Sequence, residues 1–98
     1  MPQWEVCHIE MDSRVEAGFL SKKTFTKWTA VADTLNGKQI VEQTPEWEDI
    51  DFGKYLYDLA YKKSVHFRSV LVGRLLASGW EPIVVENGQV TTLRRLIP

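Results

Sequence analysis

The chain has 98 residues, of which 44% are apolar and 26% charged, and its formal net charge is −1 at pH 7. This length fits a single domain, residues 1–98, and the apolar fraction is too high for an intrinsically disordered chain. The near-neutral charge argues against a general electrostatic affinity for nucleic acid or for acidic membranes.

Residues 4–11, WEVCHIEM, are rich in strand-forming residues and predict the first strand. Alternate side chains of a strand point to opposite faces, so Cys7 and His8 lie on different sides. Both sides carry apolar groups, which favours a central strand covered on both faces. The following residues, 12–23, are predicted to be a connection that turns at Gly18.

The second strand is predicted over residues 24–32, where β-branched and aromatic residues are dense. Asn36-Gly37 is the favoured pair for a two-residue hairpin turn. Residues 38–43 are therefore expected to return antiparallel as a third strand. The next residues, 44–53, are predicted to form an acidic loop around Pro45 and Trp47.

The strongest helical pattern covers residues 64–78, and Gly79 fits the left-handed position that commonly ends a helix. Arg68 falls inside the apolar arc of this helix. It is expected either to extend outward to solvent or to be buried beside Glu81 or an acidic-loop carboxylate. The apolar arc comprises Phe67, Leu71, Leu75, Val72, Val65 and Leu76.

Residues 54–62 fit either a short helix or a strand, and we favour the helix. Their apolar arc is out of phase with that of the later helix, so a break is expected near residues 62–64.

Residues 80–85 and 89–97 predict two closing strands, joined by a hairpin turn at Asn87-Gly88. These elements together predict an α+β fold. It is an antiparallel sheet in β-β-β-α-β-β order, with the main helix, at about 64–78, on one face.

Two stretches give the chain a resemblance. Trp4-Glu5-Val6 stands in the first strand, and Leu75 to Val85 runs from a helix through Gly79-Trp80-Glu81 into an apolar strand, with Arg94 and Arg95 after it. This arrangement resembles a group of short bacterial domains of unknown function that open with Trp-Glu-Tyr. The chain departs from that pattern at Val6 and in its larger middle, from about residue 22 to 52. The resemblance implies a fold and no activity. Apart from it, Trp80 is expected to cover the end of the core.

The compartment is predicted from features that the sequence lacks. No segment approaches the ~20 apolar residues of a membrane helix, and residues 1–10 do not have the order of a signal peptide. The single cysteine, Cys7, cannot form an internal disulfide and fits a reducing compartment. We therefore expect a cytoplasmic protein without membrane association.

Residue types that carry chemistry are not grouped in any familiar catalytic pattern. Cys7 and His8 cannot share a metal from opposite faces of a strand, and the scattered glycines form no phosphate-binding loop. Cys7 is instead expected to be a small buried hydrophobe. We therefore expect no cofactor and no bound metal.

The acidic loop, residues 46–51, leaves an alternative open. Its carboxylates fit a solvated loop, and the less favoured interpretation is an enzyme that uses them with His8 or His66. They are Glu46, Glu48, Asp49 and Asp51.

Charge is divided unevenly along the chain. Residues 1–51 hold five Lys and Arg against ten Asp and Glu, whereas residues 52–98 hold seven against three. The two halves either neutralise each other within one molecule or associate head to tail between molecules.

These observations favour a non-enzymatic protein-interaction module, with a homodimer formed through strands as its preferred state. The alternative is single-stranded nucleic-acid binding through the Lys-rich, aromatic strand of residues 22–32, which is possible but not favoured. The candidate interaction residues are Lys23, Phe25, Trp28, Trp47, Arg94 and Arg95.

Overall fold

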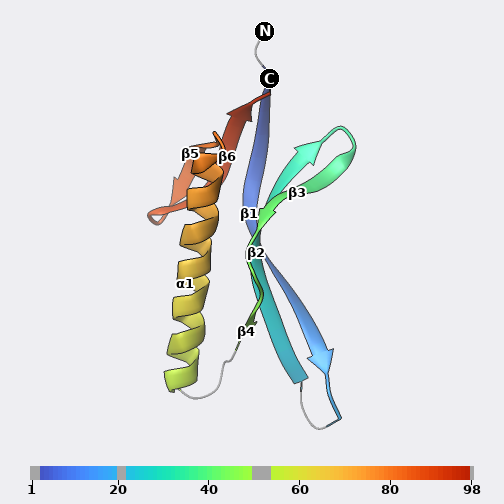
Figure 1. Ribbon diagram of the computed structural model, residues 1–98, viewed down its shortest axis with the longest axis vertical. Coiled ribbons are helices and arrows are strands. Elements are labelled where there is room, and N and C mark those ends of the chain that lie inside the picture. The colour runs from blue at the N-terminus through green and yellow to red at the C-terminus, as the bar shows by residue number, and fades with distance from the viewer. Residues whose placement is uncertain (1–2, 20–21, 50–53, 98) are drawn as a thin grey trace.

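The computed structural model describes residues 3–19, 22–49 and 54–97. Its fold is α+β, as the sequence predicts, with one helix among the described residues and an antiparallel sheet (Figure 1). The elements are β1 (Trp4–Ala17), β2 (Lys22–Thr34), β3 (Gly37–Gln43), β4 (Trp47–Asp49), α1 (Lys54–Ala77), β5 (Glu81–Glu86) and β6 (Gln89–Leu96).

The sheet has the strand order β3-β2-β1-β6-β5, and β4 pairs with β2 beside this path. β1 is central, as predicted, because it pairs with β2 on one side and with β6 on the other. Helix α1 runs along the sheet on one side (Figure 1). The expectation that β1 is covered on both faces is therefore wrong. The face away from α1, which we call the outer face, keeps Trp4 40% exposed.

The hairpin of β1 and β2 is longer than the sequence interpretation allowed. β1 continues past Met11 to Ala17, and its pairing with β2 runs without interruption from Cys7–Ala32 to Ala17–Lys22. The prediction that residues 12–17 belong to a connection is wrong. Opposite charges support the extra length, because Asp12 pairs with Lys27 and Glu16 with Lys23. Gly18 follows the strand, and residues 20–21 of the turn lie outside the described residues.

Helix α1 is continuous from Lys54 to Ala77, so residues 54–62 are helical and the break near residues 62–64 is absent. Its buried stripe passes through Ala60, Leu71 and Leu75. Small side chains, Ala60 and the half-buried Ser64, continue the stripe toward the N-terminal end. The pattern of large apolar residues alone does not reveal this continuity. The side chains of Phe52, Tyr55 and Leu56 lie outside the described residues.

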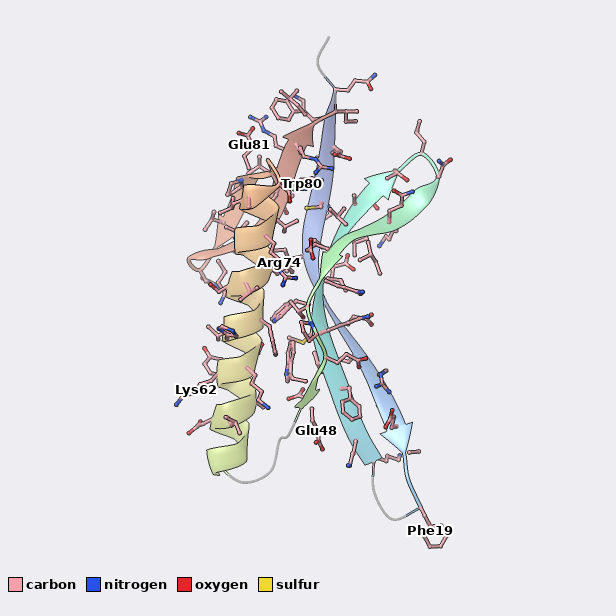
Figure 2. The ribbon with its side chains drawn as sticks, in the orientation of Figure 1. Phe19, Glu48, Lys62, Arg74, Trp80 and Glu81 are labelled. Atoms are coloured by element: carbon pink, nitrogen blue, oxygen red, sulfur yellow. The ribbon has the colours of Figure 1, made fainter. Side chains whose placement is uncertain are left out.

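The end of α1 has the predicted form. Gly79 has φ +91°, the Trp80 N–H donates to the Leu75 carbonyl at 3.0 Å, and the Gly79 N–H donates to the Leu76 carbonyl at 3.2 Å. These two bonds satisfy carbonyls that the helix end would leave unpaired. Trp80 is thereby directed back between the helix and the sheet (Figure 2), where its side chain is buried as predicted.

The two predicted hairpin turns differ in outcome. Asn87 and Gly88 both have positive φ, as a two-residue turn of the favoured type requires. The earlier turn is displaced by one residue, since Thr34 pairs with Gly37 and the loop consists of Leu35 and Asn36. Gly37, with φ +99°, begins β3 in a conformation that other residues rarely adopt.

The buried core is small for the size of the molecule. It consists mostly of modest side chains, while the molecule extends 57 × 29 × 19 Å with a radius of gyration of 15.8 Å. A compact domain of 100 residues has a radius of gyration of about 13 Å. The elongation leaves apolar surface uncovered. The core residues are Cys7, Ala30, Ala32, Leu71, Leu75, Trp80 and Leu93.

Candidate interaction surface

An unpaired strand edge is the most prominent feature of the described residues. β6 pairs with β1 only between Trp4 and His8, whereas β2 pairs with the other side of β1 as far as Ala17. From Ile9 onward one side of β1 therefore has no neighbouring strand among the described residues. In the lower half of Figure 1, β1 forms the outer margin of the hairpin on the side away from α1. We call Ile9–Ala17 the open edge.

The other sheet edges carry features that hinder strand pairing. β5 contains Pro82, which has no N–H to donate, and its pairing with β6 shifts register on both sides of Val84. β3 is short, and β2 has a register shift opposite it, between Ala30 and Val31. The open edge has neither proline nor glycine, and its pairing with β2 keeps a constant register. Its geometry is therefore the best suited to accept another strand.

Side chains of the open edge alternate between apolar and charged. On the side that faces α1, Met11 is 53% exposed and Val15 is 62% exposed. Beyond them, Phe19 projects fully exposed at the tip of the hairpin (Figure 2). The outer face of the same edge is charged and carries Glu10, Asp12, Arg14 and Glu16.

Arg14 organises the charges on that outer face. Its Nε donates to Glu46 at 2.7 Å and its Nη1 donates to Glu16 at 2.6 Å, while its guanidinium lies 4.7 Å from the centre of the Phe25 ring. The hydrogen bond to Glu16, and then that to Glu46, raise the pKa of Arg14 above its usual value. Arg14 is thus a cation held over β2, on the side of β1 away from the open edge.

A groove of about 530 Å³ lies between α1 and the sheet, next to the point where β6 separates from β1. Arg68 crosses it, donating from Nη2 to the Val90 carbonyl at 2.6 Å with its guanidinium 5.3 Å from the Trp28 ring. Burial lowers the pKa of Arg68. Arg68 therefore follows neither predicted arrangement. It does not extend to solvent, because it is half-buried and bonded to a backbone carbonyl. It is not beside Glu81 either, because Glu81 pairs with Arg94. The apolar lining includes Met11, Tyr61, Val65, Val72 and Val90.

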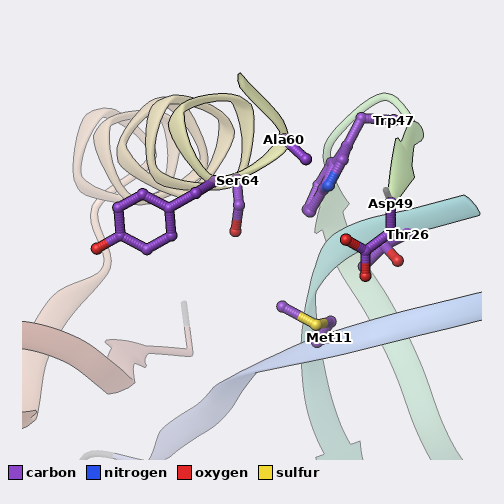
Figure 3. Close-up of a pocket in the computed structure, with 7 residues that line it drawn as sticks. Met11, Thr26, Trp47, Asp49, Ala60 and Ser64 are labelled. Carbon is purple, nitrogen blue, oxygen red and sulfur yellow. The ribbon is translucent and has the colours of Figure 1, made fainter. Parts of the chain in front are cut away.

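A smaller hollow of about 220 Å³ adjoins the groove and shares Met11, Tyr61 and Ser64 with it. Figure 3 shows Ala60 and Ser64 on the helix facing Trp47 across this hollow, with Met11 on the strand below. Asp49 is its one described carboxylate.

Neither histidine reaches either hollow. His8 lies on the outer face, where a 3.2 Å hydrogen bond joins its Nδ1 to Thr92 Oγ1. His66 is exposed on α1 beside Phe67. These two hollows therefore do not bring a histidine together with the carboxylates of the acidic loop.

The carboxylates of the acidic loop are dispersed. Glu46 is bound to Arg14, Glu48 is exposed, and Asp49 lines the smaller hollow, while Asp51 lies outside the described residues. The described residues contain no group of three or more His, Cys, Asp or Glu side chains placed to hold a metal ion.

Cys7 is a buried core residue, as the sequence predicts. Its side chain is fully enclosed, and burial raises the pKa of its thiol from 9.0 to about 11. It lies on the face opposite His8, as strand alternation requires.

Two of the predicted interaction residues belong to an aromatic stack inside the molecule. Trp47 is 5% exposed, and its ring centre lies 5.7 Å from that of Phe67 and 6.4 Å from that of Trp28. The Trp28 Nε1 donates to the Ser64 carbonyl of α1 at 2.9 Å. These contacts connect β2, β4 and the helix, so both tryptophans have a structural part.

The other predicted residues lie in separate places. Lys23 is exposed near the start of β2, opposite Glu16, and Phe25 lies on the outer face, whereas Trp28 is directed toward α1. The structure does not bring Lys23, Phe25 and Trp28 onto one face.

Arg94 and Arg95 lie at the far end of the sheet and on opposite faces. Arg94 donates to Glu81 at 2.7 Å and lies over the Trp4 ring at 4.0 Å. Arg95 donates to Glu5 at 2.7 Å and lies over the buried ring of Trp80 at 4.5 Å. Both guanidinium groups thus already have carboxylate and aromatic partners.

Comparison of the chain with protein-family models, with curated proteins and with solved structures finds no match. The resemblance to short bacterial domains stays a prediction. Among the described residues, no helix is both long and apolar enough to cross a membrane.

Sequence reasoning missed the open edge, because it assigned residues 12–17 to a connection. Two signals could have shown that this segment is a strand. Met11, Ser13 and Val15 alternate with charged residues, as a strand with two different faces requires. The acidic residues of this segment also face the lysines of the next strand across Gly18.

Proposed function

We propose that the protein is a non-enzymatic interaction module that self-associates by strand pairing. The single observation that carries this proposal is the open edge, where unpaired backbone stands beside the exposed side chains of Met11 and Val15. An open strand edge is a ready template for pairing with another chain.

The shape of the molecule supports the same conclusion. An elongated body with a small core gains stability when a second copy covers its exposed apolar side chains. Closed two-fold symmetry is the commonest arrangement of soluble homo-oligomers. We therefore propose a homodimer, and the lone buried thiol of Cys7 makes a reducing cytoplasm its proposed setting.

The nucleic-acid alternative has weaker support. Bases that stack in succession need aromatic rings on one accessible face, and Phe25 and Trp28 lie on opposite faces. The lysines of β2 are also opposed by acids, with Lys23 facing Glu16 and Lys27 facing Asp12.

Multi-angle light scattering and sedimentation velocity test the proposal at micromolar concentration and moderate salt. The expected result is a species of twice the chain mass of 11.3 kDa that dissociates on dilution. A species of 11.3 kDa at every concentration would overturn the proposal.

A further inference from the structure

We infer that the second copy pairs antiparallel with the open edge about a two-fold axis that passes through Ser13. The inference rests on the proposed self-association and specifies its site and register. A two-fold axis perpendicular to the sheet places equivalent faces of both strands together. The two hairpins then form one continuous sheet, with both helices on the same side.

This register gives complementary neighbours near its centre. Asp12 of one copy lies opposite the partner's Arg14, and by symmetry Arg14 of that copy lies opposite the partner's Asp12. Met11 lies opposite the partner's Val15 on the side that faces α1, so exposed apolar side chains cover each other. Directly opposed side chains of antiparallel strands are close enough to interact.

Arg14 retains capacity for this contact. A guanidinium group has five N–H donors, and the described contacts of Arg14 with Glu46 and Glu16 use Nε and Nη1. Its Nη2 makes no hydrogen bond with another described residue. The Phe25 ring and Glu46 hold this guanidinium on the β2 side of β1, so Arg14 turns toward the open edge when it meets the partner's Asp12.

Two symmetry-related pairs in this register are unfavourable, because Glu10 of each copy faces the partner's Glu16. The bond from Arg14 to Glu16 offsets part of that repulsion. Centring the axis on Arg14 instead would oppose two arginines. Centring the axis on Val15 pairs Arg14 with the partner's Glu16. In that register, however, only Ser13–Ala17 of the open edge pairs with the partner strand. The Ser13 register is preferred because it pairs the whole open edge.

The groove beside α1 is consistent with the same arrangement. Met11 lines both the groove and the smaller hollow, and in the Ser13 register the partner's Val15 lies next to Met11. The second strand therefore brings an apolar side chain to the mouth of the groove, close to Tyr61.

Cysteine cross-linking tests the register. Ser13→Cys, Val15→Cys and, as a matched control on the β3 edge, Gln39→Cys are treated with a short bismaleimide, after circular dichroism has shown that each folds. The wild type serves as a blank, because Cys7 is enclosed. The expected result is that Ser13→Cys gives covalent dimer at a rate at least tenfold above the other variants.

Charge exchange provides a second test that does not depend on cysteine. Asp12→Arg places an arginine opposite the partner's Arg14, once on each side of the axis. The resulting repulsion is expected to weaken dimerisation roughly tenfold. Asp12→Arg combined with Arg14→Asp restores opposite charges across the axis and should recover part of the affinity. The recovery is incomplete because Arg14→Asp also removes the bonds to Glu16 and Glu46. In the Val15 register Asp12 has no paired neighbour in the strand, so Asp12→Arg would have little effect.

The outcomes separate this inference from the proposed function. A dimer that cross-links best through Gln39→Cys or Val15→Cys, or that ignores the charge exchange, overturns the Ser13 register and leaves self-association intact. A monomer by light scattering overturns both.

Discussion

Tryptophan side chains in this protein mainly organise the interior. Trp47 lies between Trp28 and Phe67, and Trp80 covers the end of the core below the guanidinium of Arg95. Each large ring connects elements that are distant in the sequence. A protein with so few large buried side chains depends strongly on them.

Trp47→Ala is expected to lower the free energy of unfolding by about 3–5 kcal/mol, because it removes the centre of the stack and leaves a cavity. Trp4→Ala serves as the control, since Trp4 is 40% exposed and contacts Arg94 at the surface. Urea denaturation followed by circular dichroism measures both. Equal losses for the two variants would contradict the structural part assigned to Trp47.

Cys7 links stability to pH. Burial raises the pKa of its thiol from 9.0 to about 11, so the folded state disfavours the thiolate. The protonated thiol of Cys7 therefore contributes fully to folding stability below pH 9, and this contribution is lost as the pH rises through 11. Urea titrations at pH 8 and pH 10.5 should show a larger loss for the wild type than for Cys7→Ala. Identical losses would show that Cys7 does not titrate in this range.

At the scale of elements, the second hairpin turn and the helix end could be predicted because their signals are local. Gly79 and Asn87-Gly88 specify backbone conformations that few other residues adopt. The length of β1 and the continuity of α1 could not be read as easily, because they depend on partners distant in sequence. Ala60, for example, is buried where the helix faces Trp47 of β4 across the smaller hollow.

Two glycines of the helix region should respond oppositely to alanine. Gly79→Ala forces a side chain into φ +91° and is expected to cost about 1–2 kcal/mol of unfolding free energy. Gly73→Ala lies within α1 with open space around it, and should stabilise the protein by about 0.5–1 kcal/mol. Thermal unfolding of both variants checks the signs. A stabilising Gly79→Ala would contradict the described helix end.

At the scale of the whole molecule, the fold class and central strand could be predicted, whereas the interaction surface could not. Aromatic and basic residues are the usual candidates for an interaction surface, but in this chain they serve packing at Trp28 and Trp47 and ion pairing at Arg94. The open edge arises because β6 leaves β1 after His8. That divergence depends on three-dimensional pairing, which no local pattern encodes.

Uneven charge along the chain has a partial explanation within one molecule. Ion pairs between the acidic and basic halves include Glu5–Arg95 at 2.6 Å and Glu42–Arg74 at 3.5 Å. The neutralising interpretation is therefore supported at these contacts, and the open edge supplies a separate reason for association.

The most direct measurement is amide hydrogen exchange along Ile9–Ala17, followed by NMR at low and high protein concentration. In an antiparallel strand alternate N–H groups face the open side, and these exchange freely in a monomer. Self-association through the open edge predicts that these alternate amides become protected as concentration rises, while the exchange of β3 and β5 edge amides stays unchanged. Concentration-independent exchange along Ile9–Ala17 would contradict it.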